Sequence, residues 1–272
     1  MSVNQYPSLK EILAQHVQKA DYERYLFASR FVFRPPSFPA IWLLVRLGVS
    51  SEAASWLSGL AAFAAYACLL WPGAPLLWPG VALLMLFNFS DCLDGGIARA
   101  MRTRNPYGRF LDSIMGWADM IFWTVIGVTV WRLPELRAAG DALGLPPLVW
   151  AAAGVLCSFF VCYYSSLEVM FDQVLRPYWE PSSGGNGTVP SSSPLRGKTG
   201  AAFWGRVVVS NLRVRETHYL LLAAACLTGT ADLLLAFFLA FSGLFTAVLL
   251  VTYCRRGKAV FNSGAGREPL PK

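Results

Sequence analysis

Long apolar runs separated by short polar stretches dominate the chain from about residue 40 onward. Several runs approach or exceed the roughly 18 to 20 residues that a helix needs to cross a bilayer. The pattern predicts an all-α integral membrane protein with six transmembrane helices. The expected spans cover residues 53–71, 76–98, 108–130, 146–167, about 208–227, and 233–253.

The fifth span is unusual, because only the nine residues from Tyr219 to Leu227 are continuously apolar. A crossing helix must therefore begin near Val208 and include Arg213, Arg215, Glu216 and His218. Charged side chains inside a membrane face a polar interior or a partner. This stretch is thus expected to face the inside of a helix bundle.

The segments around the spans differ from them in pattern. Residues 1–36 form a juxtamembrane segment in which residues 8–31 mix apolar and charged positions, as in an amphipathic interfacial helix that ends at the prolines 35, 36 and 39. The six-helix domain then extends over residues 37–258. Ser, Gly and Pro crowd residues 176–199, which predicts a flexible loop. Residues 259–272 form a C-terminal tail.

Composition and charge support a membrane location. The chain of 272 residues is 55% hydrophobic and 14% charged, whereas soluble domains contain about 25% charged residues. Its formal charge of +7 indicates topology signals or contact with anionic lipid rather than nucleic-acid binding. Lys and Arg gather before the first span, at 99–109, at 176–215 and after the last span, which predicts cytoplasmic termini and an even number of spans. The six cysteines show no zinc spacing.

Three aspartates stand where two predicted spans meet. Asp91 and Asp94 lie at positions i and i+3 near the end of the second span, and Asp112 lies at the start of the third. Carboxylates that converge at membrane depth repel one another unless a cation joins them. Hard oxygen ligands suit Mg²⁺ or Mn²⁺. The pattern therefore predicts a site for one or two divalent ions that opens toward the cytoplasm.

The neighbouring residues fit a phosphate-bearing ligand. Gly95 and Ala98 leave little side-chain bulk beside Asp94, so a nucleotide can approach the helix backbone. The planar guanidinium of Arg99 is suited to a diphosphate. Gly108 lets the next helix begin close by.

These residues resemble the signature of the CDP-alcohol phosphotransferase family, which has the pattern D-x2-D-G-x2-A-R-x8-G-x3-D-x3-D. Seven positions match with correct spacing, and the eighth does not, because Gly116 stands in place of the last aspartate. The matched positions are Asp91, Asp94, Gly95, Ala98, Arg99, Gly108 and Asp112.

The resemblance implies a membrane transferase of phospholipid biosynthesis. Such enzymes transfer a phosphatidyl or related group from a CDP-linked lipid or alcohol donor to an acceptor and release CMP. The resemblance implies a six-helix bundle among membrane lipids, often a homodimer, with its active site at the cytoplasmic side. If the protein is bacterial, the membrane is the inner or plasma membrane.

The resemblance also assigns the absent aspartate as the general base toward the acceptor hydroxyl, a role that Gly116 cannot fill. Asp119, one helical turn further on, can be a substitute base or a packed polar residue. An acceptor that is already anionic needs no base and fits Arg213 and Arg215 as an anion clamp, although both also fit as topology charges. The remaining alternatives are a catalytically impaired relative that binds nucleotide or lipid, and a variant engineered at this position.

Overall fold

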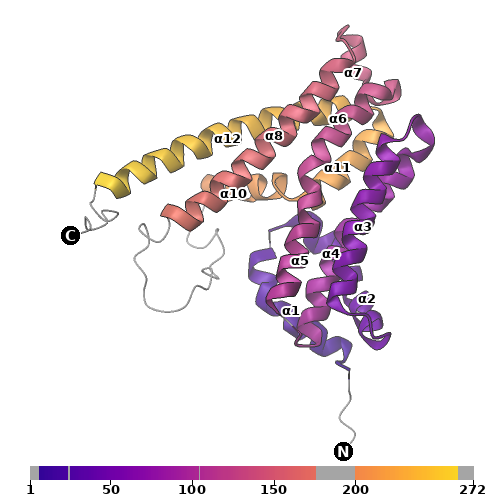
Figure 1. Cartoon of the computed structure of the whole chain (residues 1–272), viewed down its shortest axis with the longest axis vertical. Coiled ribbons are helices and arrows are strands. Elements are labelled where there is room, and N and C mark those ends of the chain that lie inside the picture. The colour runs from indigo at the N-terminus through magenta and orange to yellow at the C-terminus, as the bar shows by residue number, and fades with distance from the viewer. Residues whose placement is uncertain (1–5, 24, 104, 176–199, 263–272) are drawn as a thin grey trace, which may run out of the picture. The chain divides into compact units, whose positions relative to one another are not determined.

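A computed structural model describes residues 6–23, 25–103, 105–175 and 200–262, and these are almost entirely helical with no strand among them. The described residues fall into two compact units (Figure 1). Unit 1 comprises Met1–Asp119 and Ser191–Thr230, and unit 2 comprises Met120–Pro190 and Ala231–Lys272. The predicted loop at 176–199 and most of the predicted tail lie outside the described residues.

Unit 1 is built around three neighbouring helices of the N-terminal half, α3, α4 and α5 (Figure 1). Its elements are α1 (Leu9–Glu23), η1 (Ser29–Phe33), α2 (Arg34–Arg46), α3 (Ser51–Leu70), η2 (Ala74–Leu76), α4 (Leu77–Ala100), α5 (Pro106–Gly116), α10 (Gly200–Leu212) and α11 (Arg215–Thr228). The 3₁₀ segment η3 (Trp117–Ile121) follows α5 and ends just inside unit 2.

Side-chain caps set the starts of several helices in unit 1. Ser50 accepts a hydrogen bond from the Ala53 N–H at 3.1 Å and begins α3. At α1, the Ser8 N–H donates to Glu11 at 2.7 Å and the Glu11 N–H donates to the Ser8 hydroxyl at 3.3 Å, which forms a capping box. Hydrogen bonds from the Ser8 backbone and hydroxyl lower the pKa of Glu11.

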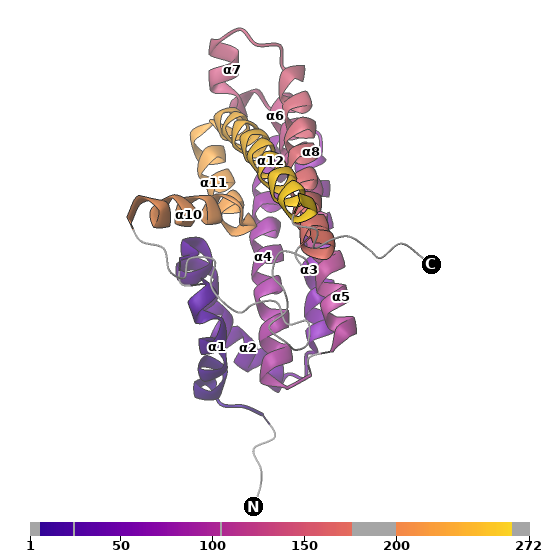
Figure 2. The same cartoon turned by 90° about the vertical axis from the view of Figure 1, so that its left-hand side faces the viewer.

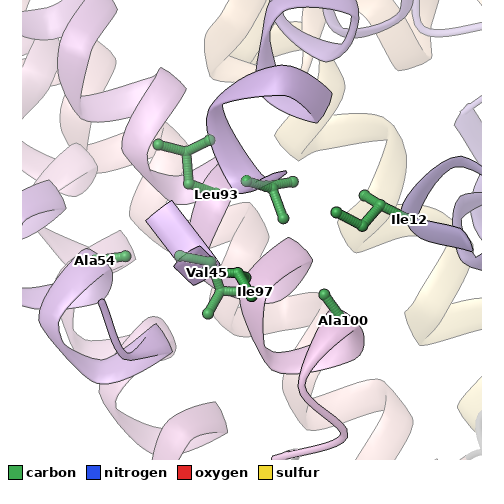
Figure 3. Packing of buried hydrophobic residues seen from close by; sticks show 7 residues of the cluster. Ile12, Val45, Ala54, Leu93, Ile97 and Ala100 are labelled. Carbon is green, nitrogen blue, oxygen red and sulfur yellow. The ribbon is translucent and has the colours of Figure 1, made fainter. Parts of the chain in front are cut away.

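Helix α1, Leu9–Glu23, covers the first part of residues 8–31, and the amphipathic character expected there is not confirmed. Its Ile12 is buried in an apolar cluster with Val45 of α2 and Ile97 of α4 (Figure 3). This packing ties α1 to the end of α4 that carries the aspartates. Its location at a membrane surface stays a prediction.

The prolines after α1 have a different role from the expected one. Pro35 and Pro36 lie in the first turn of α2. Backbone N–H groups in the first turn have no intrahelical acceptor, so proline, which has no N–H, is tolerated there and the two prolines begin a helix. Pro39 lies inside that helix. The helix runs from Arg34 to Arg46.

Five helical stretches in the described residues are long and apolar enough to cross a membrane. They correspond to the first four and the sixth predicted spans. Their bounds are Ser51–Leu70, Ala74–Ala100, Pro106–Arg132, Leu148–Leu175 and Ala231–Ala259.

The expected fifth span is divided into two shorter helices, so the count of six is not confirmed. Helix α10 has 13 residues and α11 has 14. Val214 between them has an extended backbone, with φ −96° and ψ 135°, and the chain changes direction there (Figure 2). The break coincides with the charged residues that a continuous membrane helix would have had to accommodate.

Unit 2 consists of helices that pack through aromatic side chains and closely spaced backbones. Its elements are α6 (Phe122–Arg132), η4 (Pro134–Leu136), α7 (Ala138–Ala142), α8 (Leu148–Met170), η5 (Phe171–Leu175) and α12 (Ala231–Asn262). Trp123 of α6 stacks on Phe238 of α12, with ring centroids 4.5 Å apart. The buried Asp232 carboxylate accepts a hydrogen bond from the Gly140 N–H at 2.7 Å, which links α12 to α7.

Helices α6 and α8 meet where both carry glycine. A β-carbon added to Gly127 would lie 2.5 Å from the Trp150 carbonyl oxygen and 2.7 Å from the Gly154 Cα. Both of these neighbours are backbone atoms, so they cannot yield by changing rotamer. Small residues at such crossings are typical of membrane helix pairs, because they let the backbones approach.

Gly127→Ala is therefore expected to push α6 and α8 apart and to destabilise the protein by about 1 to 3 kcal/mol. The measurement is the temperature at which purified protein in detergent loses its monodisperse size-exclusion peak. Gly205→Ala is the matched control, because nothing lies within 4 Å of a β-carbon added at Gly205. Equal stability of the two variants would contradict the prediction.

Candidate metal centre

Three carboxylates converge in unit 1. Asp91 and Asp94 lie one turn apart on α4, and Asp112 lies on α5. One carboxylate oxygen from each lies within 4.8 Å of the others. The structure thus brings together the three aspartates that the sequence singles out. Three negative charges this close repel one another strongly, and an all-oxygen donor set fits Mg²⁺ or Mn²⁺.

Two hydrogen bonds hold Asp94. Its side chain is buried, and the Ser55 hydroxyl of α3 donates a hydrogen bond of 2.6 Å to its Oδ2. Its Oδ1 accepts from the Gly95 N–H. These contacts fix the carboxylate in one orientation, so its free lone pairs point in a constant direction.

A cavity of about 160 Å³ adjoins the carboxylates. Two of its lining residues, Arg99 and Arg109, are basic, and Ser55 and Asn105 add neutral polar groups. The six motif residues that line it are Asp94, Gly95, Ala98, Arg99, Gly108 and Asp112. The motif therefore surrounds a polar space of mixed charge rather than a set of isolated loop residues.

The two motif glycines, Gly95 and Gly108, have different structural roles. A β-carbon at Gly95 would lie 3.3 Å from Arg99 Nη1, so glycine gives the guanidinium room beside the helix. The Gly108 N–H donates to Asn105 Oδ1 at 2.6 Å, which caps the first turn of α5. Together they place Arg99 and the start of α5 on the wall of the cavity.

Arg215 forms a second group of contacts on Asp91. It is the first residue of α11 and makes an ion pair with the Asp91 carboxylate. Its Nε donates to the Asn88 side-chain oxygen at 3.1 Å. Its guanidinium lies over the Phe87 ring, 4.7 Å from the centroid, in a cation–π contact.

Gly116, where the last motif aspartate is absent, faces this arginine. A β-carbon built on Gly116 would lie 3.8 Å from Arg215 Nη1. The guanidinium is therefore the neighbour toward which a side chain at position 116 would extend.

Asp119 has a different partner. Its Oδ1 accepts a hydrogen bond of 2.5 Å from the hydroxyl of Tyr219, which is fully buried on α11. Asp119 lies in η3, and a 3₁₀ turn has three residues rather than 3.6. The α-helical spacing that puts Asp119 one turn beyond Gly116 therefore does not apply to it directly.

The other two polar residues of the interrupted span lie close to the break. Arg213 is partly buried in the turn between α10 and α11. His218 is buried, and its Nε2 lies 2.8 Å from the Leu212 carbonyl oxygen. This contact holds the turn closed.

Sequence reasoning missed four polar residues that position the site: Ser55, Asn88, Asn105 and Tyr219. Asn105 carries a usable signal, because an asparagine followed by proline and a helical run is typical of an N-cap. Ser55 and Asn88 carry none, since single polar residues in apolar helices are common. Tyr219 resembles any aromatic residue at the start of an apolar run.

No curated protein and no solved structure matched the chain. A match was found to a family model, that of CDP-alcohol phosphatidyltransferase, over residues 51–179. The matched segment contains α3, α4 and α5 and thus all three converging carboxylates. Residues 51–179 of this chain are therefore similar to the CDP-alcohol phosphatidyltransferase family.

Proposed function

We propose that the protein is a divalent-metal-dependent transferase. It moves a substituted phosphoryl group, of the phosphatidyl type, from a CDP-linked donor to an acceptor and releases CMP in phospholipid synthesis. The observation that carries the proposal is the convergence of Asp91, Asp94 and Asp112 beside a cavity lined by the family's motif residues. Mg²⁺ or Mn²⁺ suits this donor set.

Asp91, Asp94 and Asp112 hold the metal in this proposal. A bound divalent ion supplies neutralisation of phosphate charge as the donor reacts. The chain itself orients the reactants. Ser55 fixes the Asp94 carboxylate, and Arg99 and Arg109 offer the cavity two guanidinium groups for a diphosphate. Gly95, Ala98 and Gly108 keep side-chain bulk off the cavity wall.

Transfer to an alcohol also requires removal of a proton. The acceptor oxygen forms a bond to phosphorus, the bond from phosphorus to the CMP oxygen breaks, and the hydroxyl proton passes to a base. We assign that base to Asp119, whose Oδ1 is fixed by Tyr219 so that its Oδ2 can take the proton. In the alternative, an anionic acceptor needs no base, and Arg213 and Arg215 bind it.

The setting of the reaction follows from the charge pattern of the chain. The apolar helices and the similarity to the family support a location in a membrane. We propose that both termini and the carboxylates face the cytoplasm, where a cytidine nucleotide is available. We also propose a homodimer, because the family that the chain resembles often forms one.

Asp94→Asn is expected to lower CMP release from CDP-diacylglycerol at least about 100-fold, because it removes a metal ligand and the charge that Ser55 orients. The assay uses purified protein with Mg²⁺ or Mn²⁺ and a panel of alcohol, amino-alcohol and phosphate acceptors. Glu135→Gln is the matched control, since Glu135 is exposed in unit 2. If wild-type protein binds nucleotide but releases no CMP with any acceptor, the protein is a catalytically impaired relative of the family and not an active transferase. Absence of both activities rejects the family function.

Asp119→Asn is expected to reduce turnover about 100-fold or more, because general-base catalysis typically contributes 100- to 10,000-fold. Metal binding should be unchanged, because Asp119 is outside the group of three ligands. Tyr219→Phe is expected to have a smaller effect on kcat, since it removes only the hydrogen bond that orients the base. Wild-type turnover in Asp119→Asn would mean that Asp119 only packs, which favours the anionic acceptor.

A further inference from the structure

Asp91 belongs to two groups of charges at once. On one side, its carboxylate lies within 4.8 Å of ligand oxygens of Asp94 and Asp112. On the other, it pairs with Arg215. Any cation bound by the three carboxylates therefore shares Asp91 with a positive charge that the chain already supplies.

The position of that positive charge is fixed by several contacts. Arg215 is anchored by Asn88, whose side chain is buried, and by the face of Phe87. The Arg215 side chain itself is 17% exposed. A guanidinium held from three directions is unlike a mobile surface arginine, and it stays beside Asp91 as a permanent neighbour.

Gly116 lies beside the guanidinium. A β-carbon at position 116 would lie 3.8 Å from Arg215 Nη1. An aspartate there would extend a carboxylate toward Nη1, whereas Asp91 pairs with Nη2, so the two carboxylates would share the charge of one guanidinium. The family's eighth position is thus filled in this chain by the positive end of Arg215 rather than by a fourth negative charge.

The charge balance of the cluster changes accordingly. Among Asp91, Asp94, Asp112 and Arg215 alone, with Arg99 and Arg109 of the cavity wall left to the diphosphate, two net negative charges remain, which one divalent ion neutralises. Four carboxylates without a guanidinium would carry four, which two divalent ions neutralise.

We propose that Arg215 acts as a built-in cation of the carboxylate cluster, so that this site takes one divalent ion and not two. The inference rests on the proposed metal-dependent function and concerns the number of ions rather than the reaction. Arg215 is a positioning residue in this account, since it acts through Asp91.

The test measures Mn²⁺ binding to the full chain in detergent by electron paramagnetic resonance of free Mn²⁺, together with thermal stability without metal. Wild-type protein is expected to bind one Mn²⁺ per chain. Arg215→Met is expected to be less stable without metal but to bind Mn²⁺ at least about tenfold more tightly, because the guanidinium no longer competes for Asp91. A purely structural role predicts the loss of stability without the gain in affinity and would overturn the proposal.

Two further variants make the test independent of the folding of Arg215→Met. Gly116→Asp keeps the arginine and adds a carboxylate that pairs with it, so tighter binding of the first Mn²⁺ is expected. The double variant Gly116→Asp with Arg215→Met is expected to bind two Mn²⁺. Arg46→Met is the matched control, because Arg46 is exposed and lies over Trp42; its Mn²⁺ affinity should equal that of wild type.

The outcomes separate this inference from the proposed function. Two Mn²⁺ ions bound to wild-type protein, with CMP release intact, would overturn the role of Arg215 and leave the transferase proposal standing. If neither wild-type protein nor Asp94→Asn binds Mn²⁺, both the role of Arg215 and the metal-dependent transferase proposal are overturned. Unchanged Mn²⁺ affinity in Gly116→Asp would also count against the role of Arg215.

Discussion

Electrostatic repulsion among Asp91, Asp94 and Asp112 is the constraint on which the rest of unit 1 depends. Carboxylates in an apolar helix bundle are tolerated only where hydrogen bonds or positive charge compensate them. Ser55 and the Gly95 N–H compensate Asp94, and Arg215 compensates Asp91. The helices that carry these groups, α3 and α11, are thus tied to α4 by polar contacts as well as by apolar packing.

Much of the fold could be read from apolar periodicity. Five of the expected spans agree with helices of sufficient length, because a run of about 20 apolar residues has few alternatives in lipid. The fifth is not confirmed, for a reason visible in the chain. Arg213, Arg215 and Glu216 made a continuous membrane helix costly, and the structure breaks the helix at Val214 instead. Hydropathy predicts where a chain can cross, but not how polar residues interrupt it.

The candidate site, like the fold, has parts that the sequence predicts and parts that it does not. The spacing of Asp91, Asp94 and Asp112 was sufficient to predict their convergence, because it depends on local helix geometry and one short connection. The contact of Gly116 with Arg215 could not be predicted, since nearly a hundred residues separate them and no motif links them. The same holds for Asp119 and Tyr219. Contacts made by tertiary packing leave no spacing signal in a single sequence.

The interruption at Val214 has a further consequence for the field inside unit 1. Helix α11 begins there without a side-chain cap from Val214, although the Thr217 N–H donates to the Val214 carbonyl oxygen at 3.1 Å. Aligned peptide dipoles give this end about half a positive charge. Arg215 is the first residue of the helix, so this partial charge lies one side-chain length from Asp91. A helix continuous through Val214 would have directed the dipole of that turn elsewhere.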